Sequence, residues 1–446
     1  MKLMKRLSVV LTLGLLAPLG VMLAPAAGAQ EPIRITMWLA PTGEQAFGAE
    51  CVYTAAVAPF NNQGNGITVG SSMQDTSWDI TRAALEGGPG PDIIGTPGPS
   101  FAAQLALAGL LVDLGAYARE YGWADRFASN SLNLGMVDGT LYSIPSEIET
   151  LVLYYNKTLF EQHGWEVPRT LDELMSLSQT ISSAGIVPFA HGNADWRPAN
   201  EWYVGEFLNH GAGPQKVHDA LAGKTPWTDP AFAASIDMLA TMQRNGWFSG
   251  GLDGYHTTTF SDAANMLGDG RAAMKIEGSW LVEDLKNNFG GAAGNSNDWD
   301  WAPAPSADGS TIFDIGIGQT YSIKADSEHP EAAAKFLDYY FSPETQARLL
   351  AQCGLAPAPV DLTGQDLSGV DPRFLEILAA VNEAYAANTY GYTTWTFWPP
   401  QTETYLIDAI EKVWSGDMTV AEYLEGMQST FDAETAAGTL PPLPAR

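Results

Sequence analysis

The residues best suited to molecular recognition in this chain are tryptophans placed after strands or within loops. Trp280 follows a Gly–Asp–Gly turn, a short apolar strand predicted over 272–276, and the small residues Gly278 and Ser279. At the carboxyl end of a strand, a tryptophan can face a cleft and stack on the flat apolar face of a sugar ring. Core packing is the alternative, because tryptophans are highly buried on average.

A sugar site needs a second chemistry, since carboxylates and amides must bind the ring hydroxyls. The chain offers 51 acidic residues and 14 tryptophans, several of them in loops. Gln319 lies between Gly318 and Thr320 on a predicted strand whose glycines would permit a close backbone approach. It could therefore reach a hydroxyl.

A secreted glycoside hydrolase is the rival class. Such an enzyme flanks the scissile bond with two carboxyls, about 5 Å apart for a retaining mechanism. Glu147 and Glu149 fall on one face of a strand if side chains alternate there. Nothing else supports catalysis, since nucleophile-elbow, metalloprotease and phosphate-loop motifs are absent, and no catalytic residue is assigned. A structural or adhesion protein would be expected to show repeats, and none is found.

Composition narrows the ligand. The 446 residues suggest two or three domains, and 46% hydrophobic residues with 16% charged ones fit a folded globular protein. The formal net charge of −29 disfavours nucleic acid and anionic ligands, so a neutral ligand fits better. No two of the six histidines are spaced i, i+3 or i, i+4, so no zinc site is predicted. No other metal and no cofactor is assigned.

The first 29 residues read as a cleaved signal peptide. A basic start precedes an apolar stretch over 7–23 and the small residues Ala27, Gly28 and Ala29. No cysteine stands at the cleavage point, so lipid attachment is not expected, and the location is periplasmic or extracellular. Cys51 and Cys353 are the two cysteines, and an oxidising compartment favours a disulfide over two buried thiols.

Alternating strand and helix patterns predict an α/β lobe at the start of the mature chain. Strands are expected over 33–39, 67–73 and 91–94, and a helix over 45–58 that Pro59 ends. Further along, Thr170 and Glu173 form a capping-box pattern that predicts a helix start.

Several short motifs, in order, resemble one family over nearly the whole mature chain. They occupy 139–145, 155–157, 168–174, 268–280, 298–305, 316–324, 330–346 and 355–358. The chain resembles the carbohydrate-binding solute-binding proteins of ABC importers, with Leu171 where the family usually carries tryptophan. No single motif is diagnostic, and the order and spacing of the set carry the resemblance.

The resemblance implies a periplasmic-binding-protein-like α/β fold: two lobes joined by a three-segment hinge, with a ligand cleft between them. The expected division is signal peptide 1–29, lobe 1 over 30–145 and 305–353, and lobe 2 over 146–304 and 354–446. A monomer would capture a neutral carbohydrate, close around it and deliver it to membrane permease subunits. The alternatives are a secreted glycoside hydrolase and a binding protein for a non-sugar solute.

The resemblance also implies candidate ligand contacts. Trp395 and Trp398 lie in a segment like the one whose tryptophan stacks on sugar in the family, and Glu149 lies at a crossing where the family places a glutamate. Loop 191–203 resembles one that supplies contacts from the second lobe, and the turns after the first strands should face the cleft. The candidate set is Trp38, Asp75, Trp78, Glu149, Asp195, Trp196, Trp280, Gln319, Trp395 and Trp398.

Overall fold

The computed structural model describes residues 31–39, 45–73, 78–88, 90–128, 131–195 and 199–443, without the side chains of 45–48, 73 and 78–80. The predicted signal peptide lies outside these residues. Among the helices described, none combines the length and the apolar character that a membrane span requires.

One mixed sheet runs through the molecule, in the strand order β2-β1-β3-β10-β6-β8-β7, with β11 paired to β10 and β9 to β6. Neighbours β1, β2 and β3 are parallel, whereas β10 and β6 are antiparallel to each other. A separate pair is formed by β4 (Met136–Val137) and β5 (Thr140–Leu141). The strands of the main sheet are β1 (Ile33–Leu39), β2 (Ile67–Met73), β3 (Ile93–Thr96), β6 (Ile144–Asn156), β7 (Val187–Phe189), β8 (Ala272–Gly278), β9 (Trp299–Ala302), β10 (Asp314–Ile323) and β11 (Gly391–Tyr392).

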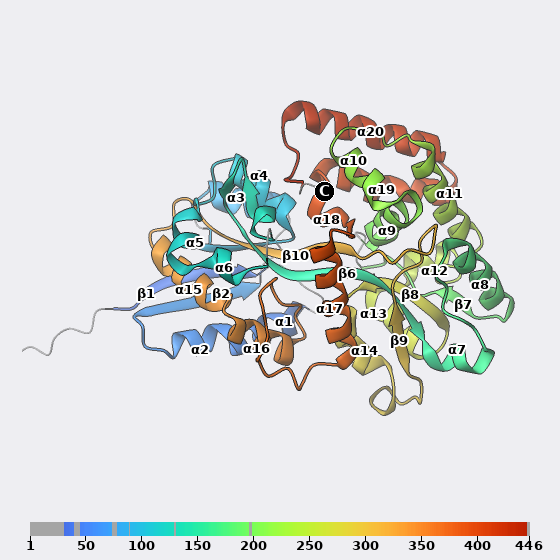
Figure 1. Cartoon of the computed structure of the whole chain (residues 1–446), viewed down its shortest axis with the longest axis horizontal. Helices are drawn as coiled ribbons and strands as arrows, with labels where there is room; N and C mark the ends of the chain where they lie inside the picture. Colours follow the sequence, from blue (N-terminus) through green and yellow to red (C-terminus); the bar gives the residue numbers. More distant parts are fainter. Residues whose placement is uncertain are drawn as a thin grey trace, which may run out of the picture.

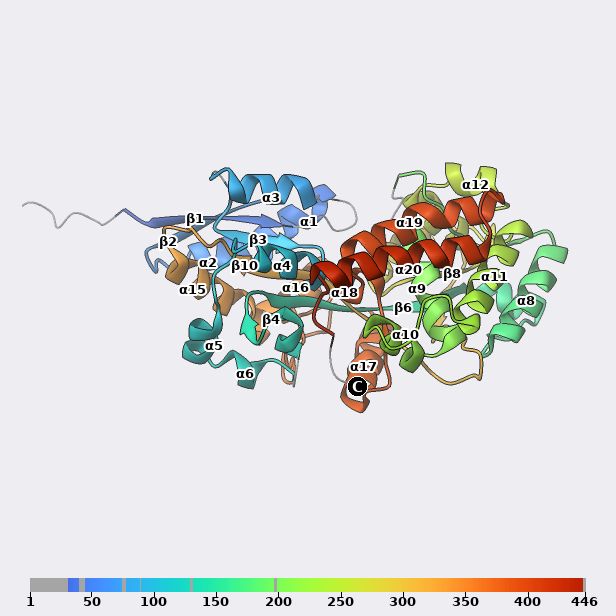
Figure 2. The same ribbon diagram turned by 90° about the horizontal axis from the view of Figure 1, so that it is seen from above.

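Helices flank the sheet in two groups, left and right in Figure 1, and the view from above separates the same groups (Figure 2). The left group holds α1 (Gln45–Val52), α2 (Ala58–Asn61), α3 (Trp78–Glu86), α4 (Pro99–Leu107), α5 (Gly115–Tyr121), α6 (Trp123–Arg126), α15 (Pro330–Tyr340) and α16 (Pro343–Cys353). The right group holds α7 (Lys157–His163), α8 (Leu171–Ser183), α9 (Asn200–Ala212), α10 (Pro214–Leu221), α11 (Pro230–Arg244), α12 (Leu252–Thr257), α13 (Phe260–Gly268), α14 (Leu281–Asn288), α19 (Pro400–Ser415) and α20 (Val420–Ala437). Between them lie α17 (Pro372–Ala387) and α18 (Thr394–Phe397).

Two large hydrophobic cores correspond to the two groups. One packs side chains of β1, β2 and α15 with the start of β6 and the end of β10. The other packs β8, α9, α11, α19 and α20 with the rest of β6 and the start of β10. Strands β6 and β10 therefore belong to both cores and join two α/β lobes. We propose the lobe boundaries given above, except that the segment from residue 305 to the start of β10 packs with lobe 2.

Local sequence signals explain several of these elements. The capping box at α8 is confirmed: Glu173 N–H donates to Thr170 Oγ1 at 3.1 Å, and Thr170 N–H donates to Glu173 Oε2 at 3.1 Å. The predicted end at Pro59 is wrong. A π-helical segment, Tyr53–Val57, shifts the hydrogen-bond register, and the helix then continues to Asn61 with Pro59 in its first turn, where a missing N–H costs little.

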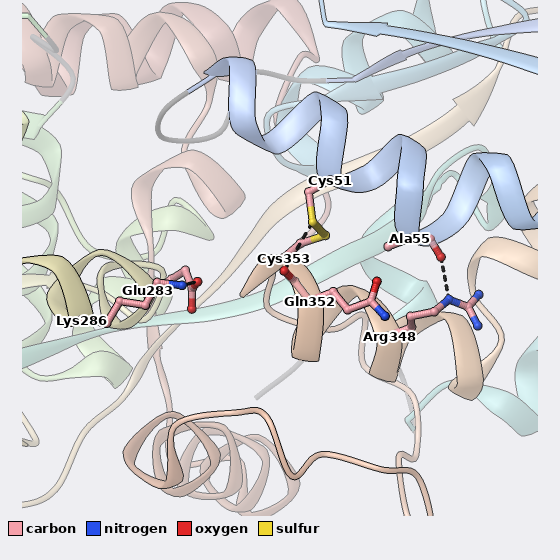
Figure 3. Close-up of a disulfide and its surroundings, with 7 residues drawn as sticks. All are labelled: Cys51, Ala55, Glu283, Lys286, Arg348, Gln352 and Cys353. Atoms are coloured by element: carbon pink, nitrogen blue, oxygen red, sulfur yellow. Dashed lines mark hydrogen bonds and ion pairs between the residues drawn. A yellow bond between two sulfur atoms is a disulfide. The ribbon is translucent and has the colours of Figure 1, made fainter. Parts of the chain in front are cut away.

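The predicted disulfide is confirmed. Cys51 on α1 is bonded to Cys353 on α16 with a Cα–Cα distance of 5.7 Å, and the two cysteines are 302 residues apart in sequence (Figure 3). The same two segments share a second contact, because Arg348 Nε donates to the Ala55 carbonyl oxygen at 2.6 Å. Both segments belong to lobe 1, so the bond joins its two separated stretches of chain.

Candidate ligand site between the lobes

The centre of the candidate site is a pair of glycines on β10. Gly316 pairs with Glu149 of β6, so these two residues lie on the same face of the sheet. Gly318 lies two residues further along β10 on that face, about 7 Å away. A Cβ on Gly318 would come within 2.4 Å of Glu149 Oε1, and one on Gly316 within 2.7 Å of the Trp395 indole. The glycines thus let a carboxyl group and an aromatic ring lie side by side on the strand.

Contacts with lobe 1 fix the position of Trp395. Trp395 lies on α18. Its carbonyl oxygen packs so close to Gly98 that a Cβ on that glycine would be 2.4 Å away. Gly98 also has a left-handed backbone, with φ 80°. Ser100 Oγ, on α4, donates to the neighbouring Thr396 carbonyl at 3.0 Å. The Trp395 ring itself is half-buried, and among the described residues its Nε1 has no hydrogen-bond partner.

Trp280 occupies the position expected from the sequence, directly after β8 and before α14. Its ring lies against Gly278, where a Cβ would be 2.2 Å away, and its Nε1 donates to Glu277 Oε1 at 3.0 Å. The ring is half-buried and contacts Trp395 edge-on at 5.9 Å between centroids. The predicted turn, strand and tryptophan therefore bring Trp280 to the same cluster as Trp395.

Sequence reasoning missed four residues that extend the cluster. Trp202 packs against Trp280 at 5.5 Å, and Phe260 packs against Trp202 at 6.2 Å. Lys275 and Glu277 form a buried ion pair at 2.8 Å beside them. Two opposite charges, spaced i, i+2 in an otherwise apolar strand, were the signal that could have identified this pair.

The two predicted glutamates at the junction are buried acids. Burial, with a further contribution from the charge of Glu147, holds the pKa of Glu149 well above its usual range, and burial raises the pKa of Glu147 to about 8. No hydrogen bond or ion pair joins either carboxyl to a residue in the described part of the chain. Glu149 can therefore both donate and accept hydrogen bonds near neutral pH.

This strand pair departs from the expected alternation at one residue, and Gln319 lies away from the glycines. Glu147 adopts a left-handed backbone (φ 55°), which interrupts the extended conformation that strict alternation with Glu149 requires. Gln319 alternates with the glycines, so its side chain lies on the opposite face of β10, where its Oε1 accepts a hydrogen bond from the Tyr321 hydroxyl at 2.9 Å. The geometry does not support Gln319 as a contact on the glycine face.

Trp398 does not join this cluster. Its side chain has no exposed surface and packs against Trp227 at 5.6 Å in the core of lobe 2. The sequence placed it three residues from Trp395 in one aromatic segment, but α18 turns the two rings to different environments.

The remaining candidates stay predictions. Asp195 is exposed, and its Oδ1 accepts the Phe260 N–H at 2.9 Å, which places it beside the aromatic cluster. Trp38 is half-buried near the carboxyl end of β1. Trp78 is the first residue of α3 but its side chain is not described, and Asp75 and Trp196 lie outside the described residues.

A separate pocket of about 360 Å³ lies on lobe 2, between α10, the α18–α19 segment and the residues near 440. Its lining is largely apolar and includes Leu221, Phe397, Pro399, Leu440 and Leu443. Because it offers few groups that could bind hydroxyls, we keep the candidate site at the glycine face of β10.

Two α/β lobes sharing a pair of crossing strands, with aromatic rings and a carboxyl group at the crossing, define a two-lobe solute-binding protein. The chain belongs to the bacterial extracellular solute-binding protein family, whose model matches residues 45–347. The fold agrees with a solved chitin oligosaccharide binding protein at TM-score 0.76 and 23% identity, covering 90% of this chain and 99% of that one.

Relatives in sequence include two named proteins. The osmoprotective compounds-binding protein GgtB of Synechocystis sp. is 29% identical over 47% of this chain, and 50% of its own length is matched. The alpha-glucosides-binding periplasmic protein AglE of Rhizobium meliloti is 31% identical over 44% of this chain, and 45% of its own length is matched. The chain thus spans about half the length of these relatives.

Proposed function

We propose that the protein is the extracytoplasmic binding component of an ABC importer, which captures a neutral carbohydrate between its lobes and delivers it to permease subunits. The observation that carries the proposal is the pairing of Trp395 with Glu149 over Gly316 and Gly318. An aromatic face and a hydrogen-bonding carboxyl then meet one sugar ring together. The relative named as alpha-glucosides-binding, and the net charge of −29, both favour a neutral ligand.

Binding would act through the lobes and involve no turnover. A ligand that contacts both lobes favours the closed arrangement by its differential affinity, and the closed form would dock on the permease. We propose Trp280, Trp395, Glu149 and Asp195 as contacts from the lobe-2 side and Trp38 as a contact from lobe 1. Export by the predicted signal peptide would place the protein in the periplasm or outside the cell, as a monomer without a cofactor.

Calorimetry with a panel of neutral sugars, including alpha-glucosides and chitin oligosaccharides, tests the proposal. We expect one sugar class to bind with one-to-one stoichiometry, and Trp280→Ala to weaken binding about tenfold because stacking area is lost. Trp165→Ala is the matched control, since Trp165 is also half-buried but stacks on His163, outside the cluster. Tight binding of a charged solute only, or hydrolysis of a glycoside by the pure protein, would refute the proposal.

A further inference from the structure

A second polar cluster lies inside lobe 2, at the other end of the same face of β10. Glu206 and His210 are four residues apart on α9, so they project from one side of the helix. Asp314 is the first residue of β10. His210 Nε2 is 3.3 Å from Glu206 Oε1 and 3.6 Å from Asp314 Oδ1, and each of the three side chains is at most 2% exposed.

A backbone carbonyl on the side of the ring away from the two acids orients the imidazole of His210. Its Nδ1 lies 3.1 Å from the Pro305 carbonyl oxygen, which can only accept a hydrogen bond, so Nδ1 carries the proton. In the neutral ring, Nε2 then directs its lone pair at the two carboxyl groups. A backbone carbonyl that fixes the tautomer in this way is the usual outer partner of a metal-binding histidine.

No cation in the described part of the chain compensates the cluster. Both oxygens of Glu206, both oxygens of Asp314 and His210 Nε2 are buried without a hydrogen-bond partner there. No described lysine or arginine forms an ion pair with either acid. Gly391 leaves room beside Asp314, because a Cβ would come within 1.8 Å of Oδ1. Two acids and a lone pair that converge in a dry interior need either a shared proton or a positive ion between them.

We propose that Glu206, His210 and Asp314 bind a divalent first-row transition metal, with Zn²⁺ as the best-fitting ion. Bonds of about 2.0–2.2 Å from Zn²⁺ to nitrogen and oxygen place tetrahedral ligand atoms about 3.3–3.6 Å apart, which are the spacings found here. A nitrogen donor favours this class of ion over Mg²⁺ or Ca²⁺, which prefer oxygen ligands in larger number. The proposal is independent of the ligand between the lobes.

The metal would have a structural role. It would join α9 to the start of β10 and, through His210, to the segment at Pro305. Its two positive charges would balance the two carboxylates, so the interior would become neutral where three segments of lobe 2 meet.

Metal titration of tag-free, chelator-treated protein tests the site. We expect one Zn²⁺ per chain by elemental analysis after dialysis, and a rise of several degrees in Tm on adding Zn²⁺ but not Mg²⁺. His210→Ala and Glu206→Gln should lose both the bound Zn²⁺ and the rise in Tm. His163→Ala should keep both, because His163 is an exposed histidine on α7.

Co²⁺ gives a readout that does not depend on a variant folding. Wild-type protein with one equivalent of Co²⁺ should show the visible absorption of a four-coordinate ion, and Zn²⁺ should displace it. If the folded wild type retains no Zn²⁺, shows no rise in Tm and gives no such absorption, the proposal is wrong and the cluster shares protons instead. Loss of binding in His163→Ala would equally overturn it.

Discussion

Two groups of buried acids lie on one face of β10, and Trp395 separates them. Along this face the order is Asp314, Gly316 and Gly318, with the Trp395 ring over Gly316. On one side Glu149 lies beside half-buried aromatic rings, and on the other Asp314 is sealed with Glu206 and His210. The same chemical groups thus meet different demands: under the proposed function Glu149 exchanges its partner with each bound solute, whereas a sealed acid needs a permanent partner.

The largest contrast should come from the two tryptophans of the α18 segment. Trp398→Ala should lower the free energy of unfolding by about 3–5 kcal/mol, because it empties a fully buried site, and leave sugar affinity within about twofold. Trp395→Ala should instead raise the sugar Kd about 10- to 100-fold with a smaller loss of stability. Denaturant unfolding and calorimetry on both variants measure the difference. If both variants changed the free energy of unfolding and the sugar Kd equally, the distinction between Trp395 and Trp398 would be wrong.

A matched pair of acid deletions separates the two groups directly. Glu149→Ala should raise the sugar Kd about tenfold, because a hydrogen bond to a charged or acidic group is lost, and keep the Zn²⁺-induced rise in Tm. Asp314→Ala should abolish that rise and keep the sugar Kd within about twofold. Calorimetry and thermal unfolding, each with and without Zn²⁺, report both. The comparison fails if either deletion abolishes both responses.

The smallest effect should be a pH dependence of stability that arises from Glu147, beside Glu149. Because the pKa of Glu147 is raised to about 8, the folded state keeps a proton that the unfolded chain loses near pH 4.5, so stability falls as pH rises between these values. Glu147→Gln should remove this loss, with Tm equal to wild type at pH 4.5 and higher by roughly 2 °C or more at pH 8.5. Thermal scans at both pH values, with exposed Glu161→Gln as control, check the change. A variant with the wild-type pH profile contradicts it.

Patterns confined to one element were predictable from the sequence. Alternation identified β1, a short apolar run after a turn identified β8, the spacing of Thr170 and Glu173 identified the start of α8, and the order of motifs identified the family. These signals depend on neighbours in the chain, where backbone geometry alone fixes which side chains share a face.

Features set by tertiary packing were not predictable. Nothing local distinguishes Trp395 from Trp398, because their environments depend on Gly316 and on Trp227, both distant in sequence. Asp314 reaches His210 across 104 residues, so a search for paired histidines could not find their cluster. The left-handed backbone at Glu147 was also not predictable, because the alternation of side chains along a strand gives no sign of it.

The disulfide can form only after most of the chain has been synthesised. Cys51 and Cys353 lie on either side of the segment that builds most of lobe 2, and both belong to lobe 1. During synthesis from the amino terminus, the first stretch of lobe 1 must wait until residue 353 of 446 has been made before its covalent partner exists. Throughout that interval the Cys51 thiol has no native partner, so the first stretch of lobe 1 cannot be covalently closed until the first part of lobe 2 has been made.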